Sequence, residues 1–199
     1  MFRFYTEIPD TYSIFGHEFK VDLSFGTVIN LLRMIHDESL SIQGRIDYAL
    51  VFIFGNDKDT KAFFKTLDYE TKLAIYKDIY EQGISLPETK ENGGQRDILG
   101  NLLDQDEDDG PAYSLDYDSS AIFASFMQAY HIDLEQVRHT LHWQKFNALL
   151  SGLPEGTKFA QIMKYRHMDT SQIQDSQEKA YYERLKAQYA LPDQYKEGL

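Results

Sequence analysis

The chain has 199 residues, of which 42% are hydrophobic and 26% charged, and its formal net charge is −12. It contains no cysteine, which excludes disulfides, a thiolate nucleophile and cysteine-ligated zinc. Acidic surfaces repel nucleic-acid phosphates, so we do not expect a nucleic acid as a partner. The longest apolar run, Ala49 to Phe54, is far shorter than the roughly 20 residues that span a bilayer, so we do not expect a membrane as a partner either.

The N-terminal part predicts a short β-hairpin followed by a helix. The stretch "YSIFGHEFKVDL" alternates imperfectly around Gly16, as two strands joined by a tight turn would. Asp22 or Ser24 is then a suitable N-cap for a helix, because both residue types accept hydrogen bonds from the first free N–H groups. Apolar residues follow at helical spacing, namely Val28, Leu31, Leu32 and Ile35.

Two more apolar stripes predict helices before residue 84. The first stripe consists of Ile46, Ala49, Leu50, Ile53 and Phe54, and Gly55 follows it as a stop signal. Its β-branched and aromatic residues keep a buried strand open as the alternative for Ala49 to Phe54. The second stripe consists of Leu73, Tyr76, Ile79 and Tyr80, and Gly83 ends it.

Residues 87–117 predict an acidic, flexible linker. Residues 87–118 carry 10 acidic and 2 basic side chains, a net charge of −8, and five of the six positions from Asp104 to Asp109 are acidic. An EF-hand calcium loop needs oxygen ligands at positions 1, 3 and 5, glycine at position 6 and glutamate at position 12. The acidic run and Gly110 do not meet these requirements in either register, whether the loop starts at Asp104 or at Gln105. We therefore interpret the acidic segment as a solvated charge run rather than a specific calcium site.

The C-terminal part predicts a series of helices. Asp118 or Ser119 caps the first, whose expected buried face is Ile122, Phe123, Phe126, Met127 and Tyr130. Asp133 caps the second, which carries Leu134, Val137, Leu141, Phe146, Leu149 and Leu150 and ends near Gly152 and Pro154. Thr157 caps the third, with Phe159, Ile162 and Met163 inward. The last has a weaker stripe of Ala180, Tyr181, Leu185 and Tyr189.

These elements predict a mainly α protein, a bundle-like arrangement of helices with a small N-terminal β-hairpin. We place an N-terminal ribbon and helices at 1–86, the acidic linker at 87–117 and a C-terminal helical portion at 118–199. No nucleotide-binding, hydrolase or metalloprotease motif is present. The sequence therefore predicts no catalytic residue and no cofactor, and the protein is not expected to be an enzyme.

Three C-terminal stretches carry a family resemblance. They read "YDSSAIFASFMQAYHIDL", "LHWQKFNALLSGLPEGTKFAQIMKYR" and "YYERLKAQYAL", and they lie within residues 117–191. They resemble the bacteriophage gene-product-fifteen family, whose pattern includes D-x-x-x-I-x-A-x-F-x-x-x-Y-x-I-D-L, L-H-W-x-K-F-x-x-L-L-x-x-L-P, I-x-x-Y-R and K-x-x-Y-x-L. The chain departs from that pattern at His131, where members often have glycine, and at Gln144, where they often have an aromatic residue.

The resemblance implies a tail-morphogenesis protein of long-tailed phages and prophages of Gram-positive bacteria. It implies a tail assembly chaperone, with the tape-measure protein and the tail-tube protein as partners, acting in the cytoplasm of the bacterial host. A minor structural component retained in the virion tail is the alternative. The resemblance leaves open whether the chain associates with itself as a homo-oligomer.

Four residues are candidates for partner binding, and each has a structural alternative. Trp143 and His142 belong to the L-H-W motif. Trp143 could be an anchor in an interface, but we favour a position in the core, because it lies three residues before Phe146. Tyr165 and Arg166 suit partner binding or a phosphate site. The alternative that we favour is a fork between Arg166 and the carboxylate of Asp118 or Asp133 that locks two helices.

A metal-dependent enzyme is a further alternative. His139 and His142 are three residues apart and would share one face of the predicted helix, as two metal ligands do. Zinc sites need three or four ligands, and no third protein ligand is evident nearby in the sequence unless the fold brings His131 or Asp133 close. We therefore favour a structural role for both histidines and predict no metal site.

Overall fold

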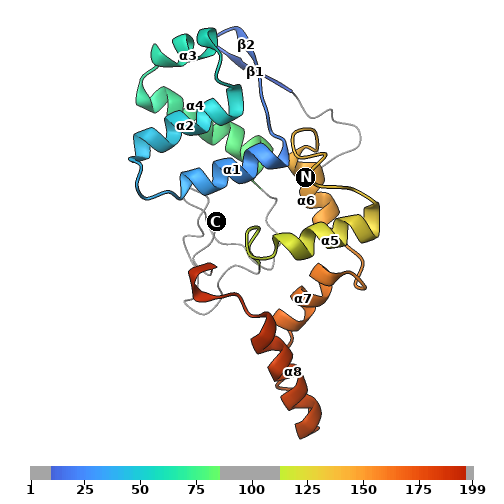
Figure 1. The fold of residues 1–199 in the computed structure, drawn as a ribbon. Helices are drawn as coiled ribbons and strands as arrows, with labels where there is room; N and C mark the ends of the chain where they lie inside the picture. Colours follow the sequence, from blue (N-terminus) through green and yellow to red (C-terminus); the bar gives the residue numbers. More distant parts are fainter. Residues whose placement is uncertain (1–9, 86–112, 196–199) are drawn as a thin grey trace. The chain divides into compact units, whose positions relative to one another are not determined.

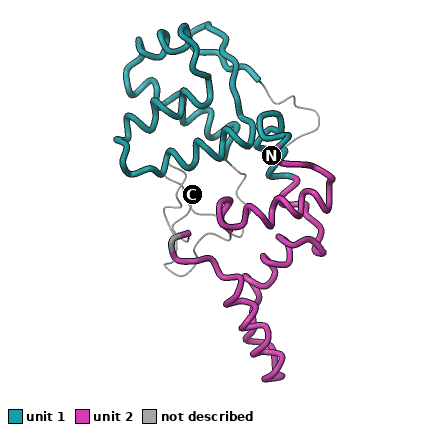
Figure 2. Tube along the Cα trace, in the orientation of Figure 1, with its two compact units in different colours: residues 1–103, 136–148 teal, residues 104–135, 149–199 magenta. Residues whose placement is uncertain are grey.

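The computed structural model describes residues 10–85 and 113–195. It is mainly helical with one two-stranded antiparallel hairpin at the N-terminal side, which confirms the predicted fold class (Figure 1). The chain divides into two compact units (Figure 2). Among the described residues, unit 1 contains 10–85 and 136–148, and unit 2 contains 113–135 and 149–195. The predicted linker lies largely outside the described residues, but its last five residues, 113–117, belong to unit 2.

The hairpin joins strand β1 (Thr11–Ile14) to strand β2 (His17–Lys20), with Ile14 paired to His17. Its inner face meets an aromatic cluster in which Phe19 lies 4.8 to 5.8 Å, between ring centroids, from Phe54, Phe63 and Phe64. The Tyr12 hydroxyl donates a hydrogen bond to the Asp78 carboxylate. Burial and this carboxylate raise the pKa of Tyr12 to about 12, so the phenol stays protonated as a donor.

Helices α1 (Phe25–Ile35), α2 (Ile42–Phe54) and α4 (Tyr69–Ile79) form the core of unit 1. The segment from Ala49 to Phe54 is therefore helix and not strand. Helix α2 contacts both α1 and α4. The fully buried side chains come from the predicted stripes and include Val28, Leu31, Ile35, Ile46, Leu50, Ile53 and Tyr76. Burying each large aliphatic side chain contributes about 1.5–3 kcal/mol.

The sequence did not predict helix α3 (Lys58–Lys65) or the π-helical turn η1 (Tyr80–Ile84). Helix α3 is only 8 residues long, too short for a clear apolar stripe. Its one signal is Asp57, whose carboxylate accepts hydrogen bonds from the N–H groups of Asp59 and Thr60. Asp57 is therefore the N-cap of α3.

The helix predicted from Leu134 to Leu150 is wrong in its first half. Residues 134–140 form turns, and helix α6 runs only from Trp143 to Ser151, beginning in unit 1 and ending in unit 2. The backbone at the N-terminus of α1 explains the interruption. The N–H groups of Phe25 and Gly26 donate to the carbonyls of Leu141 and Arg138, at 2.9 and 3.1 Å. A continuous helix would direct those carbonyls along its own axis instead.

This contact satisfies the first N–H groups of α1, which have no partner within the helix. Ser24 is the N-cap of α1 but makes no side-chain cap bond. On the other side, the N–H of Trp143 donates to the Leu23 carbonyl at 2.8 Å, which completes a short antiparallel bridge between Ser24 and His142. We call residues 23–26 and 138–143 together the α1 junction.

Gly26 allows the two backbones of the α1 junction to approach each other. A Cβ atom at position 26 would lie 2.7 Å from the Arg138 carbonyl oxygen and 2.4 Å from the Arg138 Cγ. The carbonyl is backbone and is itself bound to the Gly26 N–H, so it cannot move away without breaking that hydrogen bond. Glycine is therefore required at this position for steric reasons.

We predict that Gly26→Ala lowers the free energy of unfolding by about 1–3 kcal/mol, although alanine is the better helix former. Urea unfolding monitored by Trp143 fluorescence measures the change. Gly156→Ala is the matched control, because a Cβ atom there meets nothing within 4 Å. Equal stability of the two variants would contradict the steric role of Gly26.

Unit 2 is built from helices α5 (Ser119–Tyr130), α7 (Lys158–Arg166) and α8 (Ser176–Tyr189) and the 3₁₀ turn η2 (Asp193–Tyr195). Helix α7 contacts both α5 and α8. The predicted buried face of α5 is half wrong: Ile122 and Phe126 are buried, but Phe123 and Met127 are exposed. The predicted stripe on α8 is also wrong as a buried face, because α8 has no buried residue.

The buried face of α5 contains Ser125 in place of Phe123 and Met127. The Ser125 side chain is completely buried. The hydroxyl donates to the Ala121 carbonyl at 2.7 Å and accepts a hydrogen bond from the Phe159 N–H at 2.9 Å. Ser125 thus caps the N-terminus of α7 from a neighbouring helix, where the N-cap residue Thr157 makes no side-chain cap bond.

The C-cap residue of α5, His131, has a backbone conformation that favours glycine. His131 has the left-handed conformation, with φ 53°. That conformation ends many helices and is adopted by glycine without steric cost, whereas a side chain makes it less favourable.

Candidate functional site

The four residues predicted for partner binding fall into two places. His142 and Trp143 lie in unit 1, at the α1 junction, whereas Tyr165 and Arg166 lie at the end of α7 in unit 2. Their role in partner binding stays a prediction, and what the structure describes is the surroundings of each side chain.

Trp143 lies in the core of unit 1, as we favoured over an interface anchor. Only 4% of its surface is exposed. The indole N–H donates to the Ile84 carbonyl at 2.8 Å, and the ring stacks on Phe146 at a centroid distance of 5.7 Å. Phe146 in turn stacks on Phe25 at 4.9 Å. Trp143 thereby joins α6 to α1 and to the turn after α4.

His142 is half-buried beside Trp143. Its Nδ1 accepts a hydrogen bond from the Gln144 N–H at 3.1 Å, so the neutral ring carries its proton on Nε2. Nε2 is buried and has no hydrogen-bond partner among the described atoms. Burial and, to a smaller extent, the charge of Lys145 lower the pKa of His142 from 6.5 to about 4, against the opposing effect of Asp22.

We predict that His142 makes the stability of the protein depend on pH. Its folded pKa lies below the unfolded value, so the neutral ring contributes stability above pH 6.5, and that stability is lost as the pH falls from 6.5 to about 4. We expect a loss of about 1–2 kcal/mol, discounted because the ring is only partly buried.

Urea unfolding between pH 7 and pH 4 measures this effect against His142→Asn. Asparagine keeps an acceptor for the Gln144 N–H but does not titrate. The wild type is expected to lose about 1–2 kcal/mol more than the variant over this range. Parallel pH profiles of the two proteins would rule out His142 as the titrating group.

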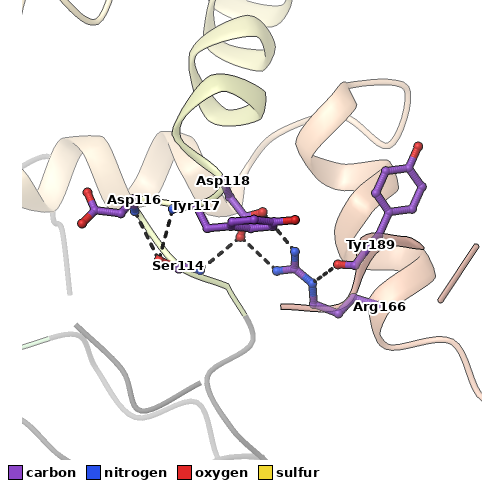
Figure 3. A network of polar contacts seen from close by, with 6 residues as sticks. All are labelled: Ser114, Asp116, Tyr117, Asp118, Arg166 and Tyr189. Carbon is purple, nitrogen blue, oxygen red and sulfur yellow. Dashed lines mark hydrogen bonds and ion pairs between the residues drawn. The ribbon is translucent and has the colours of Figure 1, made fainter. Parts of the chain in front are cut away.

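Arg166 is the centre of a polar network in unit 2 (Figure 3). Its Nη1 and Nη2 donate to the two carboxylate oxygens of Asp118 at 2.9 and 3.0 Å, and its Nε donates to the Tyr189 carbonyl at 2.9 Å. Only 9% of the Arg166 side chain and 2% of the Asp118 side chain are exposed. Of the two carboxylates that the sequence offered, Asp118 is therefore the partner of Arg166.

The network also orders the entry into α5. The Asp118 carboxylate accepts a hydrogen bond from the Ser114 N–H at 3.0 Å, and the Ser114 hydroxyl accepts from the N–H groups of Asp116 and Tyr117, both at 3.3 Å (Figure 3). Arg166 and Asp118 thus connect the turn before α5, the end of α7 and the end of α8. A bidentate guanidinium–carboxylate pair has the geometry to fix three segments together.

A solvent-open cleft of about 380 Å³ lies over this ion pair, and we call it the unit 2 cleft. Its walls include the apolar surfaces of Tyr117, Ala121, Ile162 and Tyr189. The exposed Lys158 lies at its edge, with Nζ 3.2 Å from the Tyr189 hydroxyl and 4.9 Å from the centre of that ring. Tyr165 stacks on Tyr189 from α7, at a centroid distance of 5.8 Å.

We predict that Arg166→Met lowers the free energy of unfolding by about 3–5 kcal/mol, because the buried Asp118 carboxylate would lose its partner. Adding Asp118→Asn should cost much less than the sum of the two single changes, since the two groups act as a pair.

Thermal and urea unfolding of the two single variants and the double variant measure this coupling. Lys72→Met is the control, because it breaks the more exposed Lys72–Asp47 pair, of 2.8 Å, and should cost no more than about 1 kcal/mol. An additive double variant would show that Arg166 and Asp118 are energetically independent.

The premise of the metal-enzyme alternative is wrong. His139 and His142 do not share a helical face, because His139 lies in a turn and His142 in the antiparallel bridge. The described part of the chain contains no group of three or more His, Cys, Asp or Glu side chains that could hold a metal ion.

The sequence reasoning missed three exposed apolar features. Phe123 and Met127 are 36% and 40% exposed on α5, Tyr48 and Phe52 are 53% and 36% exposed on α2, and Phe15 is 75% exposed at the hairpin turn. Each of the two pairs has a spacing of four residues, which places both side chains on one helix face. That spacing was visible in the sequence, but spacing alone does not say which apolar face is buried.

A comparison with known protein families decides the identity of the chain. Residues 4–191 match the family described as Bacteriophage Gp15 protein. The chain belongs to this phage family. No curated protein and no solved structure matches the chain.

The family match extends over both units, and so includes the α1 junction and the unit 2 cleft. It thereby confirms the resemblance that the C-terminal motifs carried, and it identifies the chain as a phage protein. Within the described ranges, none of the helices combines the length and the apolar character needed to cross a membrane.

Proposed function

We propose that the protein works without catalysis in building the tail of a long-tailed phage, in the cytoplasm of the host bacterium. In this proposal it is an assembly chaperone that holds the tape-measure protein until tail-tube subunits replace it. Membership of the phage family supports the general setting. The exposed face of helix α5 is the observation that supports a binding role for this chain.

Helix α5 offers an uncharged and partly apolar face. None of its 12 residues, "SSAIFASFMQAY", is Asp, Glu, Lys, Arg or His, in a chain of which 26% is charged. Phe123 and Met127 are 36% and 40% exposed, and Ala124 lies exposed between them. Covering this face would remove apolar surface from water without desolvating a charge, which is the expensive part of most surface contacts.

The chemistry of this face suits an amphipathic helix as client. Two large side chains one helical turn apart match the apolar anchors of a helix bound side by side. The methionine is unbranched and polarisable, so it adapts to different apolar partners along a long client. A tape-measure protein presents such helical segments repeatedly, and a chaperone needs many similar contacts rather than one specific one.

The acidic character of the chain fits the same role. A net charge of −12 would help to keep a complex with an apolar client soluble. The acidic run from Asp104 to Asp109 would favour basic surfaces on the tape-measure or tail-tube protein. The apolar face would then supply affinity, and the charges would supply selectivity and solubility.

Co-expression with the tape-measure protein of the same phage tests the proposal. We expect the wild type to keep that protein soluble and to co-purify with it. The double variant Phe123→Gln/Met127→Gln should bind about 10–100-fold more weakly at unchanged thermal stability, because both side chains are exposed. Tyr48→Gln/Phe52→Gln on α2 is the matched control and should bind like the wild type.

A tape-measure protein that is equally soluble without this chain would overturn the chaperone role. Equal loss of binding in the α5 and α2 variants would overturn the assignment of the α5 face. Mass spectrometry of purified tails separates the chaperone from a retained tail component, since a chaperone should be absent from finished tails and a component present at fixed stoichiometry.

A further inference from the structure

The turn of the hairpin places a large aromatic residue in a conformation that disfavours it. Ile14 and His17 pair across a two-residue loop of Phe15 and Gly16, and both loop residues have positive φ, 51° and 82°. This type of turn favours asparagine, aspartate or glycine at its first position. A bulky side chain with positive φ is uncommon, and the strain needs an explanation outside the turn itself.

The Phe15 ring buries little surface that could offset this strain. It is 75% exposed, the most of the large hydrophobic side chains in the described ranges. The other aromatic residues of the hairpin, Tyr12 and Phe19, point into the aromatic cluster of unit 1. A residue that is unfavourable for the backbone and exposed to water suits a contact with another molecule.

The unit 2 cleft has the size and chemistry to hold a phenyl ring. Its volume is about 380 Å³, and a cavity of roughly 150 Å³ already holds benzene. The walls offered by Tyr117, Ile162 and Tyr189 are apolar or aromatic. The charges of Asp118 and Arg166 beneath them neutralise each other, so an entering ring would not desolvate an unpaired charge.

The charges beside the ring and at the cleft edge are complementary. Glu18 is exposed on the hairpin three residues after Phe15, and Lys158 is exposed at the edge of the cleft. Strands β1 and β2 carry one acid, Glu18, and one base, Lys20, so the carboxylate and ammonium charges of the hairpin cancel. In a chain with a net charge of −12, such neutral surfaces are the ones that two copies can bring together without repulsion.

We propose that Phe15 of one copy inserts into the unit 2 cleft of a second copy, with Glu18 of the first beside Lys158 of the second. The contact joins two different surfaces, so a pair of copies keeps one free cleft, on the first copy, and one free hairpin, on the second. Such head-to-tail contacts close into a ring or extend into a filament. The proposal does not depend on the identity of the client, because neither Phe123 nor Met127 takes part in it.

Sedimentation velocity of the purified full-length chain, over roughly 1–200 μM, tests for self-association. We expect the wild type to form species larger than a dimer as concentration rises. Phe15→Asn should weaken association about 30-fold or more, because it removes the anchor. The same change should raise the thermal midpoint by about 2–4 °C, since asparagine suits the turn. A monomeric wild type over the whole range overturns the proposal, as does a Phe15→Asn variant that assembles like the wild type.

Charge reversal and mixing test the pairing of hairpin and cleft. Glu18→Lys and Lys158→Glu should each weaken association, and the double variant should recover most of it. Phe15→Asn retains its cleft and Lys158→Glu retains its hairpin tip, so an equimolar mixture of these two variants should form a 1:1 dimer that does not grow. Absence of that dimer, or of recovery in the double variant, overturns the head-to-tail pairing. The variants change exposed side chains, and thermal unfolding checks that each is folded.

Discussion

Unit 1 depends on a backbone contact between segments more than 110 residues apart in the chain. The free N–H groups at the start of α1 are buried polar groups that need acceptors, and the carbonyls of Arg138 and Leu141 supply them. The same contact stops the second C-terminal helix from starting before Trp143. It also places the indole of Trp143 against Phe146 and its N–H against the Ile84 carbonyl. One requirement of elementary hydrogen bonding thus fixes both the break in the helix and the position of the only tryptophan.

Periodicity predicted the elements whose structure is decided locally. The hairpin at Gly16, the helices α1, α2 and α4, and the C-terminal helices follow from apolar spacing and capping residues. The interruption at 134–142 could not be predicted in this way, because the apolar residues there have helical spacing. The carbonyls of Arg138 and Leu141 are instead needed as hydrogen-bond acceptors by the start of α1, which is far away in the sequence. Gly26 was in principle a sign of a close backbone contact, since a residue without a side chain at the start of a helix lets another segment approach. That the approaching segment contains Arg138 was not visible in the sequence.

The candidate site shows the same division between local and distant information. A fork between Arg166 and a carboxylate was predictable from residue type, but the choice between Asp118 and Asp133 required the fold. The exposure of Phe123 and Met127 was not predictable, because the face of α5 that turns inward contains the polar Ser125, bonded to the Phe159 N–H, beside Ile122 and Phe126.

Unit 1 is not continuous along the chain, and this matters during synthesis on the ribosome. The segment 136–148, which supplies acceptors to α1 and the ring of Trp143, is translated after residues 104–135 of unit 2. At bacterial elongation rates of about 5–20 residues per second, the α1 N-terminus waits for several seconds before its acceptors leave the exit tunnel. The α1 junction therefore cannot form until part of unit 2 has already been made.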